Sequence, residues 1–187
     1  MLFPYDTQTD ISPSAVKIQK ENLKQFELAN FDDIAVDQFI ANRTAFYDQL
    51  LARLWRHFQF ADDSTLSLIA VGGYGREEMF PLSDLDILIL TEQPATPALQ
   101  ENLGQFVQFL WDCGFNVGHS IRTLEECKTE GLADITIATN LLEVRYLCGN
   151  RNMFKALVNL VQQSDFWSKN GFLSGKNSGE NRTLSTL

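Results

Sequence analysis

Two short motifs near the middle of the chain bring together residue types that handle phosphate groups and metal ions. Gly72 and Gly73 follow an apolar run, and because glycine has no Cβ, backbone N–H groups there can approach a phosphate closely and adopt φ > 0. Asp84 and Asp86 open a second apolar run. In a strand both carboxylates would point to one face, with Cα atoms about 6.5–7 Å apart. Such a pair can hold two divalent cations, so the motifs predict metal-dependent nucleotidyl transfer.

The spacing of these motifs resembles that of a known superfamily. Two glycines, ten intervening residues and an Asp-x-Asp motif among apolar residues are similar to the pattern of the nucleotidyltransferases typified by DNA polymerase β. The longer strings 71–90 and 111–127 are specific when they occur together. They resemble the amino-terminal catalytic domain of the bacterial PII uridylyltransferase/uridylyl-removing enzymes, and the resemblance covers residues 41 to 167.

This resemblance implies an activity, a cofactor and two partners. Members of the family transfer UMP from UTP to a tyrosine of the PII nitrogen-regulatory protein and release pyrophosphate. Asp84 and Asp86 would be both the catalytic residues and the metal ligands, with two Mg²⁺ ions as the expected cofactor. UTP and the PII protein are the expected partners, and the sequence leaves the oligomeric state open.

Two further residues are candidates for binding the nucleotide, in addition to the glycine pair that would cradle its phosphates. Ser83 is a candidate hydroxyl donor to a phosphate, and its alternative role is that of a turn residue. Arg76 is a candidate phosphate ligand through its planar guanidinium, and the alternative is a surface salt bridge to Glu77 or Glu78. In the resembled family the position of Glu77 is commonly glycine.

A third carboxylate, which many polymerase-β-like enzymes place on a later strand, has no clear counterpart in this sequence. The predicted strand 115–120 contains none, and Asp112 and Asp134 are possible substitutes. His119 and Arg122 lie in the string shared with the family and are candidates for contacts with the nucleotide or the acceptor. For His119, a position capping the core is the alternative.

The composition of the chain disfavours several classes of function. The formal net charge of −9 argues against a nucleic-acid partner, and it favours Mg²⁺ as the means of holding a triphosphate. Three cysteines without C-x-x-C spacing argue against a disulfide framework or a zinc site. The sequence shows no signal peptide and no long apolar run, so no membrane partner and a cytoplasmic location are expected.

The periodicity of apolar residues predicts an α+β (α/β) fold of the polymerase-β-like type, with a small mixed sheet flanked by helices and extra helices at both ends. Residues 1–35 are expected to form an irregular and helical lead-in, 36–165 the nucleotidyltransferase domain, and 166–187 a disordered tail rich in Ser, Gly, Asn and Lys. The chain departs from the resembled family just after residue 167, so it is expected to be a truncated form. The predicted strands are 66–71, 85–90 and 115–120, and the predicted helices are 14–28, 37–58, 74–80, 98–111, 124–132, 135–147 and 152–161.

Two alternatives to UMP transfer remain open at this point. The chain could be a catalytically silent, truncated module that binds a nucleotide or a partner, as the missing third carboxylate suggests. It could also be a nucleotidyltransferase with another acceptor. Neither His57 nor His119 is followed by aspartate, so the hydrolase centre of the full-length family is not expected in this chain.

Overall fold

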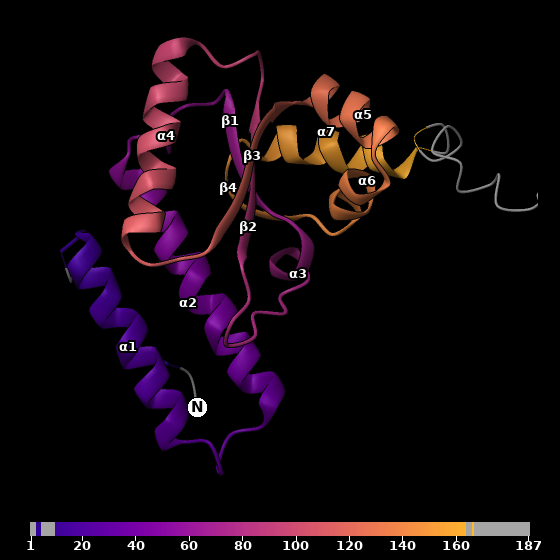
Figure 1. Ribbon diagram of the computed structural model, residues 1–187. Helices are drawn as coiled ribbons and strands as arrows, with labels where there is room; N and C mark the ends of the chain where they lie inside the picture. The colour runs from indigo at the N-terminus through magenta and orange to yellow at the C-terminus, as the bar shows by residue number, and fades with distance from the viewer. Residues whose placement is uncertain (1–2, 5–9, 164–165, 167–187) are drawn as a thin grey trace, which may run out of the picture.

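A four-stranded mixed sheet forms the centre of the computed structural model, which describes residues 3–4, 10–163 and 166 (Figure 1). The strand order is β3-β2-β1-β4; β1 is antiparallel to both β2 and β4, whereas β2 and β3 are parallel. The α+β class with a small mixed sheet flanked by helices is thereby confirmed. The strands are β1 (Leu66–Ala70), β2 (Leu85–Thr91), β3 (Val117–Thr123) and β4 (Arg145–Gly149).

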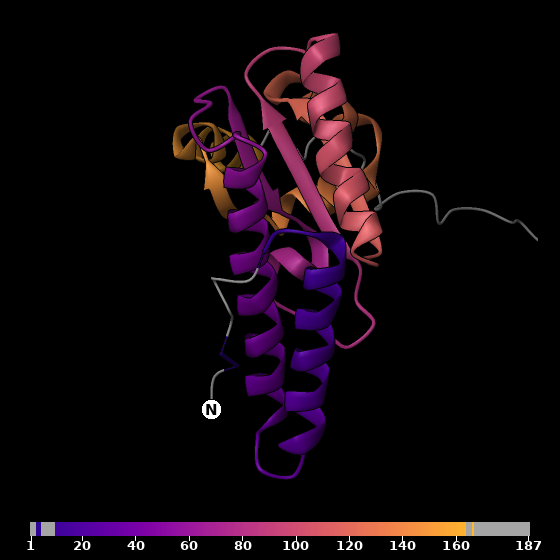
Figure 2. The same ribbon diagram turned by 90° about the vertical axis from the view of Figure 1, so that its left-hand side faces the viewer.

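Three helices cover one face of the sheet (Figures 1 and 2). They are α1 (Pro13–Ala29), α2 (Val36–His57) and α4 (Pro97–Asp112), the last being the crossover between the parallel strands β2 and β3. Each of α1 and α4 begins with a hydroxyl cap followed by proline, from Ser12 and Thr96 respectively, which satisfies a free N–H of the first turn. Large apolar side chains such as Trp55 and Phe106 fill this first core together with alternate residues of β1 and β2.

The other face of the sheet carries a smaller core under three shorter helices, α5 (Leu124–Ala133), α6 (Ile135–Leu142) and α7 (Arg151–Gln162) (Figure 1). Thr123 and Glu126 form a reciprocal capping box that starts α5 where β3 ends. Asp134 caps α6, because its carboxylate accepts the N–H of Thr136 at 2.7 Å. Leu88 and Leu90 of β2 point into this second core, so Asp86, two residues earlier, belongs to the same face.

Two predicted elements are wrong, and the others agree with the structure apart from their ends. The predicted helix 74–80 is instead the single turn α3 (Gly72–Gly75), which begins at the glycine pair itself. The predicted helix 135–147 ends at Leu142 and is followed by β4, which pairs with the free edge of β1. The backbone N–H and C=O groups of a buried strand such as β1 need partners on both sides, and β4 supplies the second set.

The predicted boundaries at residues 35/36 and 165/166 stay predictions. Val16 and Leu23 of the lead-in are buried in the first core, and Phe166 is buried in the second. The rest of the predicted tail lies outside the described residues. No helix of the described part of the chain is long and apolar enough to cross a membrane.

Gly75 allows α3 to pack directly against the segment between α6 and β4. A Cβ at this position would lie 1.7 Å from the carbonyl oxygen of Glu143.

Gly75→Ala is therefore expected to lower the free energy of unfolding by about 2–3 kcal/mol, as overpacking does elsewhere. Gly104 is the matched control, since a Cβ there meets nothing within 4 Å on an exposed face of α4. Gly104→Ala should raise the free energy of unfolding by about 0.5–1 kcal/mol, and denaturant unfolding of both variants measures the contrast. Equal stability of Gly75→Ala and the unmodified chain would contradict the packing assignment.

Candidate active site

The glycine turn and the aspartates meet at one edge of the sheet. Because β1 and β2 are antiparallel, with Ala70 opposite Ile87, the end of β1 lies beside the start of β2. The N–H of Val71 donates to the carbonyl oxygen of Asp86 at 3.1 Å, and Gly72 then turns the chain away with φ +57°. A Cβ on Gly72 would lie 3.6 Å from Asp86 Oδ2, so the turn passes directly by this carboxylate.

Only Gly72 of the pair has the left-handed conformation that the sequence allowed for both glycines. Gly73 has no positive φ, and a Cβ there would meet its nearest neighbours at ordinary distances of 3.8 and 3.9 Å. Any requirement for glycine imposed by the backbone therefore falls on Gly72. The predicted role of both glycines in holding phosphates stays a prediction.

Asp86 is half-buried and lies across the parallel register from Gly118 of β3. A Cβ at Gly118 would be 2.1 Å from Asp86 Oδ1, so a side chain at this position would displace the carboxylate. Asp84 lies one residue before β2 and is exposed. The side-chain amide of Asn116 donates to Asp84 Oδ1, and the carbonyl oxygen of Asn116 accepts the N–H of Leu85 at 2.8 Å. Gly118 and Asn116 thus position the two aspartates.

The two carboxylates repel each other across this edge. Burial raises the pKa of Asp86 above its usual value, and the negative charge of Asp84 raises it further. A divalent cation would relieve the repulsion, so this pair fits the oxygen ligands that Mg²⁺ prefers. The described residues contain no group of three or more His, Cys, Asp or Glu side chains placed to hold a metal ion.

Neither candidate for the third carboxylate lines the pocket beside Asp86. Asp112, at the end of α4, accepts a hydrogen bond from Gln108 Nε2 at 2.9 Å. Asp134 caps α6, as described above. The structure instead places an amide, that of Asn116, next to Asp84.

Arg76 and Ser83 are engaged by neighbouring protein groups. The guanidinium of Arg76 contacts Glu78 at 2.8 Å and also Glu143, so the alternative of a surface salt bridge is realised with Glu78 and extends to a residue that the sequence did not suggest. Ser83 Oγ accepts the N–H of Phe80 at 3.0 Å, which is the alternative role of a turn residue. Their predicted contacts with the nucleotide stay predictions.

Glu77 adopts φ +64°, a left-handed conformation that is unfavourable for residues with a Cβ. This geometry gives a physical reason for the glycine that is common at this position in the resembled family. Glu77 does not pair with Arg76. Its carboxylate instead lies 3.6 Å from Arg145 Nε, and its carbonyl oxygen accepts the hydroxyl of Thr44 at 3.1 Å.

A partly buried polar network fixes α3 and with it the glycine turn. The Tyr74 hydroxyl donates to Asp48 Oδ1 at 2.7 Å, and Arg145 of β4 binds both oxygens of Asp48 at 2.7 and 3.0 Å. Arg145 also donates to the carbonyl oxygen of Tyr74 at 3.2 Å. Burial raises the pKa of Tyr74 well above its usual value, and the negative charge of Asp48 adds to the shift. The phenol is therefore held neutral, as the donor that the network requires.

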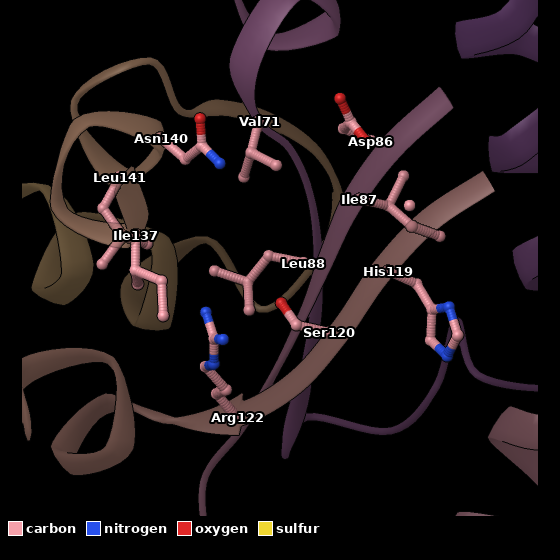
Figure 3. Close-up of a pocket in the computed structure, with 11 residues that line it drawn as sticks. Val71, Asp86, Ile87, Leu88, His119, Ser120, Arg122, Ile137, Asn140 and Leu141 are labelled. Carbon is pink, nitrogen blue, oxygen red and sulfur yellow. The ribbon is translucent and has the colours of Figure 1, made fainter. Parts of the chain in front are cut away.

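A pocket of about 220 Å³ begins at Asp86 and extends along β2 and β3 beneath α6 (Figure 3). Of the two candidates on β3, Arg122 points into it, whereas the His119 ring points away and contacts Trp111 edge-to-face at 5.7 Å between ring centroids. His119 is exposed, so it does not cap the core. The side chains that surround the cavity come from the ends of β1 and β2, from β3 and from α6: Val71, Asp86, Leu88, Ser120, Arg122, Ile137, Asn140 and Leu141.

Comparison with known proteins shows the family to which the chain belongs. Residues 27–120, about half of the chain, match the family model described as "Putative nucleotidyltransferase DUF294". The chain belongs to this nucleotidyltransferase family. It is 58% identical over 94% of its length to the bifunctional uridylyltransferase/uridylyl-removing enzyme of Haemophilus influenzae (strain PittEE), and 56% identical over 94% to that of Pasteurella multocida (strain Pm70). The corresponding enzyme of Aliivibrio fischeri (strain MJ11) is 42% identical over 91% of the chain.

These relatives are much longer proteins. The chain spans 20% of the length of each of the three. The comparison therefore places the nucleotidyltransferase domain within a region shared with uridylyltransferases, and the resemblance of the strings 71–90 and 111–127 is confirmed.

The raised pKa of Asp86 predicts a gain in stability when its charge is removed. A carboxyl group whose pKa is higher in the folded than in the unfolded state stabilises the fold most at low pH, and this contribution is lost as the pH rises through the folded-state pKa. Asp86→Asn should therefore melt at a higher temperature than the unmodified chain at pH 7, without added metal, and the difference should vanish at acidic pH. Thermal unfolding across the pH range measures it. Asp112→Asn is the control, and a lower melting temperature of Asp86→Asn at pH 7 would contradict the assigned repulsion.

Proposed function

We propose that this nucleotidyltransferase domain transfers UMP from UTP to a tyrosine hydroxyl of the PII protein and releases pyrophosphate. The observation that carries the proposal is the carboxylate pair at the sheet edge, with Asp86 between the Gly72 turn and Gly118. The choice of uridine is supported by the names of the relatives, uridylyltransferase/uridylyl-removing enzymes that are 56–58% identical over nearly the whole chain. The choice of PII rests on the family resemblance of the strings 71–90 and 111–127.

The residues of the chain supply positioning in this reaction. Asp84 and Asp86 would hold Mg²⁺, which when bound supplies charge neutralisation on the phosphates and activation of the attacking oxygen. Asn116 keeps Asp84 oriented. Gly72, whose missing Cβ leaves room beside Asp86, would let the phosphates approach the backbone. In the transfer, the tyrosine oxygen forms a bond to the α-phosphorus, the bond from that phosphorus to the bridging oxygen breaks, and pyrophosphate leaves with that oxygen. The phenol releases its proton to solvent water, and since its ordinary pKa is about 10, the step depends on such activation.

A second candidate function is a module that binds a nucleotide and transfers nothing. It is supported by the amide of Asn116, which contacts Asp84 on the side of β3, and by the lack of a cluster of three metal-binding side chains in the described residues. A different acceptor is the third candidate. Binding without transfer would favour the second, and transfer to an acceptor other than PII would favour the third.

Replacing either aspartate should abolish the transfer reaction. Asp84→Asn and Asp86→Asn remove charge but little volume, and loss of a metal ligand is expected to lower turnover by about 100-fold or more. Incorporation of labelled UMP into purified PII, with Mg²⁺ and UTP, measures the effect. Asp112→Asn, an exposed aspartate outside the pocket, is the matched control and should keep its activity. Near-normal turnover by either variant of the pair would refute the two-metal assignment.

The variant Asn116→Asp tests whether the lack of a third carboxylate limits the affinity of the site for Mg²⁺. Asn116→Asp places a third negative charge beside Asp84 at almost unchanged volume, so it should tighten Mg²⁺ binding by about 10-fold. Asn152→Asp, an exposed asparagine on α7, adds the same charge far from the site and should leave the affinity for Mg²⁺ unchanged. Calorimetric titration with Mg²⁺ compares the two. Weaker Mg²⁺ binding by Asn116→Asp would show that the amide is the better neighbour for Asp84.

A further inference from the structure

The pocket that begins at Asp86 has the size of one ring rather than of a whole nucleotide. Its volume of about 220 Å³ is below the roughly 300–1,000 Å³ typical of pockets for drug-sized ligands. Apolar side chains of Val71, Leu88, Ile137 and Leu141 form much of its wall, as Figure 3 shows. Such walls suit the faces of a flat heterocycle.

Two hydrogen-bond donors approach this cavity from opposite sides. Arg122 extends its guanidinium from β3, and Asn140 of α6 turns its amide nitrogen toward the cavity from the opposite side (Figure 3). A guanidinium can only donate. The position of Arg122 is held by Glu130 of α5, 2.6 Å from its Nη2. Asn140 is exposed, so a ligand can reach its amide from solvent.

We propose that this pocket takes the uracil ring of the substrate, with Asn140 donating to the carbonyl oxygen that cytosine replaces by an amino group and Arg122 donating to the other carbonyl oxygen. The inference rests on the proposed function, and it names the residues that select the base. Among the four common RNA bases only uracil carries two ring carbonyls; cytosine and guanine carry one and adenine carries none. An amino group in place of that carbonyl would face the amide nitrogen that Asn140 turns toward the cavity (Figure 3), a donor against a donor, which leaves a hydrogen bond unmade.

The same pocket is a poor site for the triphosphate. Part of its wall is apolar, and its one cationic side chain is already paired with Glu130. Phosphates are better placed at the Gly72 turn, where a Cβ would lie 3.6 Å from Asp86 Oδ2 and a cation held by the aspartates could compensate their charge. The base and the phosphates would thus lie on either side of Asp86.

Removing the Asn140 donor without changing charge tests the proposal. The affinities of UTP, CTP and inorganic tripolyphosphate for the chain are measured calorimetrically with Mg²⁺ and without acceptor. The unmodified chain should bind UTP at least about 10-fold more tightly than CTP. Asn140→Leu should weaken UTP binding by about 10-fold and leave tripolyphosphate binding nearly unchanged. Asn159→Leu, at an exposed position on α7, is the matched control and should change neither affinity.

Asn140→Asp is a second, nearly isosteric variant that replaces the donor by an acceptor. UTP and CTP carry the same triphosphate, so the ratio of their affinities cancels any repulsion from the added charge. This variant should shift the ratio toward CTP by about 10-fold or more. Circular dichroism verifies that each variant is folded.

The outcomes separate this inference from the proposed function. Equal binding of UTP and CTP by the unmodified chain, or a UTP-to-CTP ratio unchanged in both Asn140 variants, would overturn the uracil pocket. If either of these results were found and Asp86→Asn nevertheless lost UTP binding, the uracil pocket would be refuted and the proposed function would stand. If neither UTP nor tripolyphosphate bound to the unmodified chain, the proposed function would fail and the pocket assignment with it.

Discussion

The antiparallel pairing of β1 with β2 is the constraint on which the candidate site depends. It places Ala70 opposite Ile87, so the chain leaves β1 at the point where the aspartates enter β2. Both strands are almost fully buried, with alternate residues in two different cores. A slip of one residue would move Asp86 into the first core and Ile87 into the pocket, and the burial of Ile87 opposes such a slip. The same apolar residues that stabilise the fold therefore fix the position of the carboxylates.

The glycine turn is held in place by side chains of α2 and β4. Asp48 of α2 accepts hydrogen bonds from Tyr74 and from Arg145 of β4, so two elements distant in the sequence, α2 and β4, converge on the single turn α3. The close approach of Gly75 to the carbonyl oxygen of Glu143 fixes the turn from the other side. Since this network is formed by protein groups alone, the turn has its shape before any ligand arrives, which lowers the cost of ordering it on binding.

The sequence predicted the features that depend on local patterns and missed those that depend on pairing between strands. The long helices and β1 and β2 carry clear periodicities, and the glycine and aspartate motifs could be read directly. β4 was mistaken for helix because its residues continue a helix-like apolar spacing, whereas its conformation is set by the free edge of β1. Gly118 and Asn116 acquire their roles only because the parallel register places them opposite Asp86 and beside Asp84.

The charges around the site support the proposed dependence on a cation, and they involve more than the two aspartates. The basic side chains that could meet a phosphate are already paired, Arg76 with two glutamates and Arg122 with Glu130. Asp86 is half-buried beside a second carboxylate, and the whole chain carries a formal net charge of −9. The negative charge around the site would repel a triphosphate. Arg76 and Arg122 alone would not offset this repulsion, because each would have to break its ion pair with glutamate before it could bind a phosphate. In the proposed reaction the compensating charge would arrive with the nucleotide as a cation, and the paired aspartates would hold it.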